Sequence, residues 1–143
     1  MARMTMPQTL AEWNERGRDN LPGHLGIEIV AIEADAVRAR MPVSRRLTAW
    51  GNFLHAGAVV SLADTCCGYA TIRNLPEDAE GFTTIELKSN FFGTALEGDV
   101  LCVAKPAHKG RSTQVWDAEV RVEKTGKAIA QFRCTQMILR KKD

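Results

Sequence analysis

The stretch that decides the fold is Ala56–Arg73, which reads AGAVVSLADTCCGYATIR. It contains no proline, and Asp64 and Arg73 are its only charged residues. This composition predicts a long helix that is apolar around most of its circumference, and such a helix must be buried on most sides. Asn74 and Pro76 follow and are expected to end it.

Strand-like runs flank this predicted helix on both sides. Their β-branched and alternating apolar residues predict two strands before it and four after it, at 25–33, 36–42, 82–92, 100–108, 113–123 and 128–139. A short helix is expected at 9–18, ended by Asn20, Pro22 and Gly23. Short connections favour antiparallel pairing, because parallel strands need long crossovers. The sequence therefore predicts an α+β fold in which one antiparallel sheet wraps around a long central helix. A sheet of this kind keeps open edges, so a homo-oligomer is expected.

Length and composition exclude several classes of protein. The 143 residues fit one domain, 1–143, with a core at about 24–139. A net charge of +2 gives no reason to expect nucleic acid as a partner. No apolar run approaches the ~20 residues that span a membrane, and the first residues do not resemble a signal peptide. A cytoplasmic location is expected. The four cysteines form no disulfide framework, so reduced and mostly buried thiols are predicted. The three histidines are scattered without ligand spacing, so no metal is expected.

One stripe of the predicted helix is small and polar. At 100° per residue its members are Gly57, Ser61, Asp64, Gly68 and Thr71. The opposite, core-facing side consists of Val59, Leu62, Cys66 and Ala70. Small residues let a second chain or a ligand approach the helix closely, which makes Asp64 a candidate base or nucleophile. The alternative is structural, since a buried aspartate can also pair with an arginine or a backbone group.

The start of the helix carries a second candidate group. Backbone N–H groups in a first helical turn lack partners and lie at the positive end of the helix dipole. At Ala56 and Gly57 they could bind a carbonyl oxygen as an oxyanion hole. His55 precedes them, and a histidine in this position is either a helix cap or a catalytic group.

These segments resemble a known family. His55-Ala56-Gly57, followed after six residues by Asp64-Thr65, resembles the HGG…LAD segment of phenylacetate-pathway (PaaI-type) hotdog thioesterases, in the 4-hydroxybenzoyl-CoA thioesterase-like superfamily. TIELKSNF at 84–91, Gly98-Asp99-Val100 and HKGRS at 108–112 resemble the strand, turn and hairpin that follow in that family. The resemblance extends from about residue 24 to residue 139.

The resemblance implies a hotdog fold and hydrolysis of an acyl-CoA or aryl-CoA thioester, with CoA as part of the substrate and no cofactor. Asp64 would be the nucleophile or general base. The Ala56 N–H would bind the thioester oxygen, His55 would shape the turn, and Thr84 would position substrate or water. Two departures stand out. Ala56 replaces a glycine, and Ala49 occupies a position where the family often has Asn or Gln, which makes Asn52 a candidate replacement.

A distance argument places the active site between two chains. Asp64 lies eight residues beyond Ala56, which is ~12 Å along a helix at ~1.5 Å per residue. One thioester cannot contact both groups of a single chain, so they must come from different protomers. A dimer, with a dimer of dimers as the expected tetramer, would contain equivalent shared sites.

Further residues are expected to contact CoA or the acyl group. Gly57, Ser61 and Gly68 would line the cleft. The turn at 108–112 offers cations and backbone donors for CoA phosphates, through Lys109, Gly110, Arg111 and Ser112. Phe91 is the main aromatic candidate for the acyl pocket, with Phe82, Phe92 and Trp50 beside it.

Other functions remain open at this level. A hotdog hydratase is disfavoured, because those enzymes have an acid about fourteen residues after the histidine and this chain has Tyr69 there. A non-catalytic acyl-CoA binding domain is the alternative from another class. Catalysis by cysteine is disfavoured, because Cys66 is expected to face the core and burial raises the pKa of a thiol. The sequence does not identify the acyl group.

Overall fold

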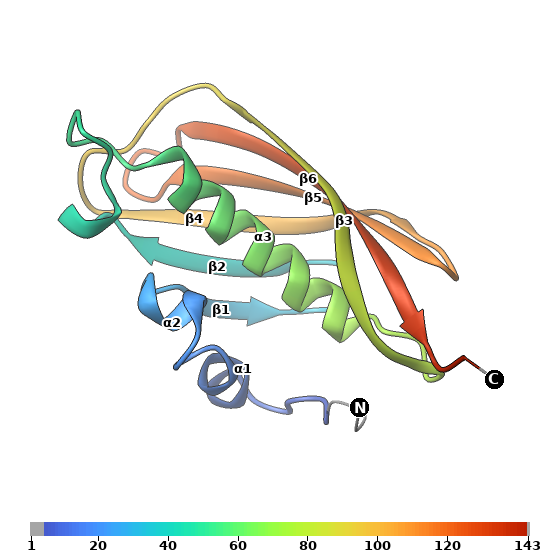
Figure 1. The fold of residues 1–143 in the computed structure, drawn as a ribbon. Coiled ribbons are helices and arrows are strands. Elements are labelled where there is room, and N and C mark those ends of the chain that lie inside the picture. The colour runs from blue at the N-terminus through green and yellow to red at the C-terminus, as the bar shows by residue number, and fades with distance from the viewer. Residues whose placement is uncertain (1–4, 143) are drawn as a thin grey trace.

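The structure is a computed structural model that describes residues 5–142, and its elements follow the expected order (Figure 1). The helices are α1 (Leu10–Arg16), α2 (Leu21–His24), the 3-10 turn η1 (Arg45–Leu47) and α3 (Ala56–Arg73). The strands are β1 (Glu28–Ile32), β2 (Val37–Pro42), β3 (Ala79–Phe91), β4 (Asp99–Lys109), β5 (Thr113–Val122) and β6 (Ala128–Arg140). The strands form one antiparallel sheet in the order β1-β2-β4-β5-β6-β3.

Helix α3 lies across one face of this sheet, and the core fills the space between them (Figure 1). Val59, Leu62, Cys66 and Ala70 are buried, as predicted for the core-facing side of the helix. Alternate residues of β6 point inward in the same way, with Phe132 among them. All four cysteines are free and buried, which confirms the prediction of buried thiols. No helix within residues 5–142 is long and apolar enough to cross a membrane.

Helix α1 covers the β1 edge of the sheet. Thr9 caps it by accepting a hydrogen bond from the Glu12 N–H, and Trp13 is buried against the ring of Tyr69 on α3. The Asn14 side chain bonds the backbone of Ile29 twice: its Oδ1 accepts from the Ile29 N–H at 2.7 Å and its Nδ2 donates to the Ile29 carbonyl at 3.0 Å. One side chain therefore occupies the place of a neighbouring strand.

No such cover lies over residues 83–88 of the opposite edge strand, β3, within the described part of the chain. Its residues 83–88 are all exposed, which is unusual because a strand over a core normally buries alternate side chains. The register with β6 places Leu87 opposite Cys134 and Phe91 opposite Ala130, both buried and inward-facing. Leu87 and Phe91 therefore point to the inner face of the sheet although each is 44% exposed. Helix α3 does not reach across this strand.

Three details differ from the predicted elements. Residues 21–24 form the short helix α2, because Pro22 sits in its first turn, where a missing N–H costs nothing. β1 starts at Glu28 and not at 25, since Gly26 adopts φ +74° in the turn before it. β3 starts at Ala79, earlier than predicted, because its first residues pair with the end of β6.

Candidate active site

The start of α3 is organised by His55. Its Nδ1 accepts a hydrogen bond from the Gly57 N–H at 2.8 Å, so His55 is the N-cap of the helix. A Cβ atom at residue 57 would lie 3.0 Å from this Nδ1, so a larger residue there would require the His55 ring to shift slightly. The neighbouring Ala56 is exposed, and its N–H has no acceptor within the described part of the chain. The helix therefore presents one unpaired donor at its tip.

Asp64 lies two turns further along the helix and is half-buried. Its Oδ1 is enclosed and has no hydrogen-bond partner, and no ion pair involves Asp64 among residues 5–142. Burial raises the pKa of this carboxyl, because the charged form loses hydration. An unpaired carboxylate oxygen in such a position is costly. Within residues 5–142, Asp64 therefore has no arginine partner of the kind that the structural alternative requires.

The small polar stripe of α3 faces the uncovered strand β3. A Cβ atom at Gly68 would lie 3.5 Å from the ring of Phe82 on that strand. Ser61 is half-buried and donates its hydroxyl hydrogen bond to the Gly57 carbonyl at 2.8 Å, so its side chain is engaged within the helix. Thr71 is fully buried, and its hydroxyl donates to the Cys67 carbonyl at 2.8 Å. Asp64 thus lies at the side of the helix where β3 forms an open wall.

The predicted site residues fall into three groups along the molecule. His55, Ala56 and Asn52 lie at the N-terminal end of α3, and Asp64 lies midway along it. Thr84 is an exposed residue of the β3 wall. Ala56 and Asp64 both lie within α3, so the eight residues between them correspond to ~12 Å along the helix axis at ~1.5 Å per residue. Asn52 has φ +61°, a left-handed conformation that Asn tolerates better than most residues, which gives it a backbone role in the turn.

The hairpin expected to bind CoA phosphates lies at the other end of the molecule. The Nζ of Lys109 pairs with Asp35 at 2.7 Å and also donates to Asn74 just beyond α3. Its charge is therefore already matched within the chain. Arg111 and Ser112 are exposed at the tip, and Gly110 is half-buried. In a single chain this hairpin is far from the Ala56 N–H, because the length of α3 separates them.

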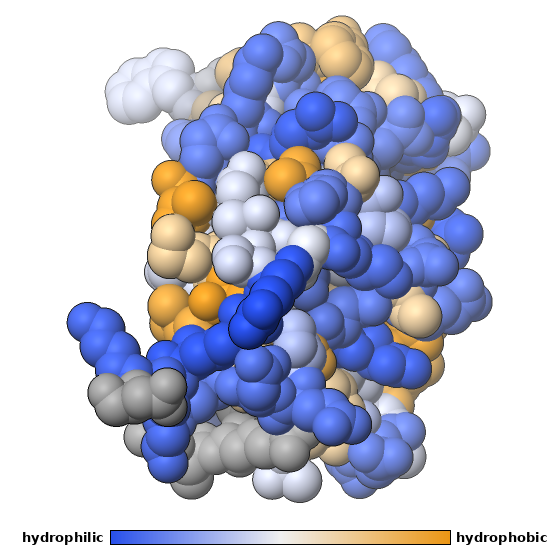
Figure 2. Space-filling view, turned by 90° about the vertical axis from the view of Figure 1, so that its right-hand side faces the viewer, coloured by the Kyte–Doolittle hydropathy of each residue, from blue (hydrophilic) through white to orange (hydrophobic). Residues whose placement is uncertain are grey.

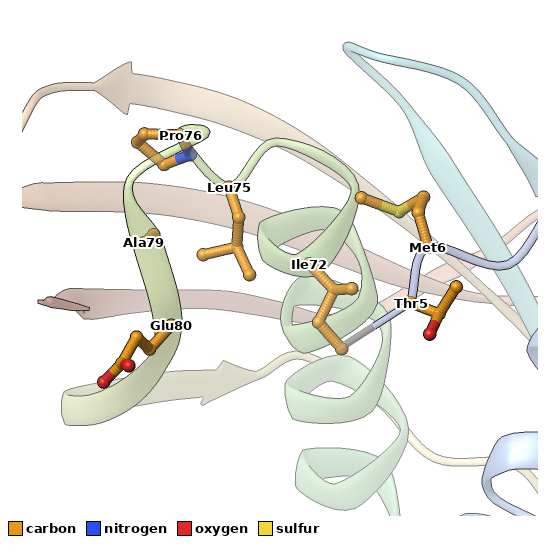
Figure 3. A pocket seen from close by; sticks show the side chains of 7 residues that line it. All are labelled: Thr5, Met6, Ile72, Leu75, Pro76, Ala79 and Glu80. Carbon is orange, nitrogen blue, oxygen red and sulfur yellow. The ribbon is translucent and has the colours of Figure 1, made fainter. Parts of the chain in front are cut away.

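A pocket and a buried amide at this same end were not predicted. The pocket, of about 320 Å³, is lined mainly by apolar side chains near the end of α3 and the start of β3 (Figure 3). It contains Glu80 but neither Asp64 nor Ala56. Gln136 is fully buried on β6 with both amide atoms unpaired, and it lies opposite Thr84. The sequence signal was a polar residue at one of the alternate positions between 132 and 138 that are otherwise apolar.

The fold and the unpaired helix groups together define a class of protein. A six-stranded antiparallel sheet with one long helix across it is the hotdog architecture, and it confirms the predicted fold. A thioesterase from Haemophilus influenzae has the same fold, with a TM-score of 0.88, 30% identity, and coverage of 94% of this chain and 93% of that one. A mutant thioesterase from Pseudomonas aeruginosa gives a TM-score of 0.89 at 27% identity, covering 95% and 97% of the two chains.

Sequence comparison gives the family itself. Residues 51–129, more than half of the chain, match the thioesterase superfamily. The 1,4-dihydroxy-2-naphthoyl-CoA hydrolase of Escherichia coli is 35% identical over 92% of this chain and 95% of its own length. The proofreading thioesterase EntH of Cronobacter turicensis is 33% identical over 76% of this chain and 79% of its own. The chain belongs to the thioesterase superfamily, and it is a thioester hydrolase of the hotdog class.

Proposed function

We propose that this thioesterase hydrolyses an acyl-CoA or aryl-CoA, with Asp64 as its catalytic carboxylate and the Ala56 N–H as its oxyanion donor. The observation that carries the proposal is the Asp64 carboxylate, whose Oδ1 is buried and unpaired beside an open strand. CoA is the activating group in the name of the E. coli relative. The acyl group of that relative is aromatic, which makes aryl-CoA the first substrate class to assay.

The reaction needs two groups on opposite sides of the thioester carbonyl. Asp64, ionised, takes a proton from water while the water oxygen attacks the carbonyl carbon. The oxyanion that forms accepts a hydrogen bond from the Ala56 N–H, at the positive end of α3. The C–S bond then breaks, and the CoA thiolate takes the proton that Asp64 had accepted and leaves as the thiol. Direct attack by Asp64, giving a mixed anhydride that water then hydrolyses, uses the same residues.

Both groups act on one thioester only if two chains share the site. Strand β3 offers the second chain a place to bind. Its backbone lies at the edge of the sheet, where it can pair with the β3 strand of another copy, and its exposed apolar side chains can pack against that copy. Figure 2 shows hydrophobic side chains gathered along the left-hand edge of the view, on a surface that is otherwise mainly hydrophilic. Pairing two β3 strands would set two α3 helices antiparallel, with each Ala56 near the other chain's Asp64 and two equivalent sites.

The remaining predicted residues take supporting roles in this arrangement. Thr84 would position water or substrate beside Asp64, and Phe91 would contact the acyl group. His55 accepts a hydrogen bond from the Gly57 N–H and thereby fixes the orientation of the neighbouring Ala56 N–H. The hairpin at 108–112 remains a candidate for CoA phosphates, chiefly through Arg111. We also propose that the protein is cytoplasmic and that two such dimers associate into a tetramer.

Mixed dimers test the shared site. Chains carrying Asp64→Ala and chains carrying Ala56→Pro, which removes the N–H, are each expected to be inactive alone. Mixing them under exchange conditions gives some dimers that contain one intact site. Recovery of activity approaching one quarter of the wild-type value supports the proposal. No recovery, with exchange verified by mass spectrometry of tagged chains, would show that both groups act within one chain or that one of them is not catalytic.

A further inference from the structure

Trp50 is the most exposed large hydrophobic side chain among residues 5–142, at 103% of full exposure, whereas the other two tryptophans are buried. It lies at the tip of a small hairpin, in which Thr48 and Leu54 pair as an antiparallel bridge. The indole therefore gains nothing from the core of its own chain. Fully exposed tryptophans are unusual in an isolated domain, and tryptophan is enriched among the residues that anchor protein interfaces.

Hydrogen bonds fix this hairpin, residues 48–54, to the start of α3. The His55 N–H donates to the Leu47 carbonyl at 2.8 Å, and the Leu54 N–H donates to the Ala95 carbonyl at 2.9 Å. Figure 1 shows that the hairpin continues beyond the N-terminal end of the helix. Trp50 is thus held ahead of the Ala56 N–H, outside the body of its own subunit.

The opposite end of α3 carries the pocket of about 320 Å³ described above. Figure 3 shows the side chains of Ile72 and Leu75 lying between Met6 and the first residues of β3. These three side chains are only half-buried, so the isolated chain leaves apolar surface open here. Glu80 is the one acidic residue of the lining, and it forms no ion pair within residues 5–142. The pocket is apolar with one free hydrogen-bond acceptor.

The geometry of the proposed dimer brings the hairpin and the pocket of different chains together. With the two α3 helices antiparallel, Ala56 lies near the partner's Asp64. The partner's Ile72 is eight residues further along, so it lies ~12 Å beyond the tip of this chain's helix, at ~1.5 Å per residue. Trp50 precedes Ala56 by six residues, and an extended chain covers ~3.3 Å per residue. The hairpin is therefore long enough to reach the partner's pocket.

Charge at the two ends is complementary. Arg45 and Arg46 are exposed just before the hairpin, and neither forms an ion pair within the described residues. Glu77 and Glu80 stand at the pocket end, also without ion pairs there. The pocket also continues directly into β3, the strand of the proposed interface. A second copy of this chain fits these features, because a two-fold axis repeats the contact of hairpin and pocket on both sides.

We propose that Trp50 of each chain inserts into the pocket of its partner and anchors the dimer. The apolar walls bury the indole ring, and the Glu80 carboxylate accepts a hydrogen bond from the indole Nε1–H. The inserted hairpin fixes the Ala56 N–H of one chain against the Asp64 of the other. This inference rests on the proposed shared site and gives Trp50 a role at the interface, where the sequence had suggested one in the acyl pocket.

Subunit association measures the anchor. Trp50→Ala should raise the dissociation constant of the dimer at least ~tenfold in sedimentation equilibrium, because truncating a buried interface tryptophan is among the costliest interface changes. The matched control is Leu21→Ala, which removes a side chain of α2 that is 57% exposed and should leave the constant unchanged. A Trp50→Ala dimer as tight as the wild type would overturn the inference.

A second variant tests whether the pocket is the place where Trp50 binds. Leu75→Ala removes one wall, and it should also weaken the dimer while the circular dichroism spectrum is kept. In the double variant Trp50→Ala/Leu75→Ala the two effects should not add, since each change removes the same contact. Full additivity would show that Trp50 binds elsewhere and would contradict the proposal.

Acrylamide quenching gives a measurement that does not depend on turnover. Trp50 is the one tryptophan that the isolated chain exposes, so quenching should be weak in the dimer and should increase several-fold on dilution to monomers. Asp64→Asn should show the same protection, because it removes catalysis and keeps the interface. A dimer in which Trp50 is freely quenched would overturn the anchor and leave the shared site standing. A wild type that is monomeric at every concentration would overturn both.

Discussion

At the scale of the residue, the ionised carboxylate of Asp64 is expected to serve catalysis and to lower the stability of the fold. Burial raises the pKa of its carboxyl. A carboxyl with a raised folded-state pKa stabilises the fold below its unfolded pKa, and that contribution is lost as the pH rises through the folded pKa. The ionised Asp64 therefore costs stability at neutral pH. Asp64→Asn should lower turnover by at least ~10² and yet raise Tm at neutral pH.

The pH dependence provides the check. Melting curves of Asp64→Asn and wild type should converge in mild acid, where the wild-type carboxyl is protonated. The kcat/KM of the wild type should fall on the acid side with an apparent pKa above that of a free aspartic acid. A variant with wild-type turnover would remove the catalytic role, and a Tm difference that grows as the pH falls would contradict the electrostatic account.

His55 acts through the backbone of the helix start. Its Nδ1 holds the Gly57 N–H, and loss of an N-cap typically costs ~1 kcal/mol. We expect His55→Ala to lower the free energy of unfolding by about this amount and to lower kcat more than it raises KM, because the Ala56 N–H would lose its fixed direction. His55→Asn, which can still cap, should recover most of the stability and part of the rate. Equal rates in both variants would indicate that His55 has a further chemical role.

At the scale of the element, Asn14 replaces a missing strand. Its two hydrogen bonds to Ile29 join α1 to the β1 edge. Since neutral hydrogen bonds contribute ~1 kcal/mol each, Asn14→Ala should lower the free energy of unfolding by ~1–3 kcal/mol and speed hydrogen exchange of the Ile29 amide. Asn14→Asp can accept from that amide but cannot donate to the Ile29 carbonyl, so its effect should be smaller. Unchanged exchange at Ile29 would show that α1 protects this edge by packing alone.

The sequence predicted elements well wherever one physical rule dominated. Helix α3 has the predicted bounds, because its start and end both carry terminating residues and its interior has none. The strands after it were found from alternating apolar residues. The helix α2 was missed because Pro22 reads as a breaker, although it is favourable in a first turn. Asn14 was missed because a polar residue on a helix surface gives no sign of a distant backbone partner.

At the scale of the whole molecule, the sequence predicted how far apart Ala56 and Asp64 lie on α3, but not the surface through which we propose that two chains bring these groups together. The separation follows from counting residues along one helix. The bare inner wall of β3 does not, because Leu87 and Phe91 have the same alternation as any core strand. Their exposure can be recognised only in the structure, where α3 leaves the inner face of β3 uncovered at these residues.

A charge on the inner wall of β3 tests the assembly directly. Leu87→Asp puts a carboxylate where the proposed dimer buries an apolar side chain, while the isolated chain already leaves Leu87 partly exposed. The variant should therefore fold and have the mass of a monomer in light scattering. Its turnover should fall by at least ~10², because each Ala56 N–H is separated from the Asp64 of the other chain. Lys88→Asp, on the same strand but facing outward beside Arg133, should remain dimeric and active. A dimeric Leu87→Asp protein would place the interface elsewhere. A monomer with full activity would overturn the shared site, since one chain would then bring together two groups that its own helix holds ~12 Å apart.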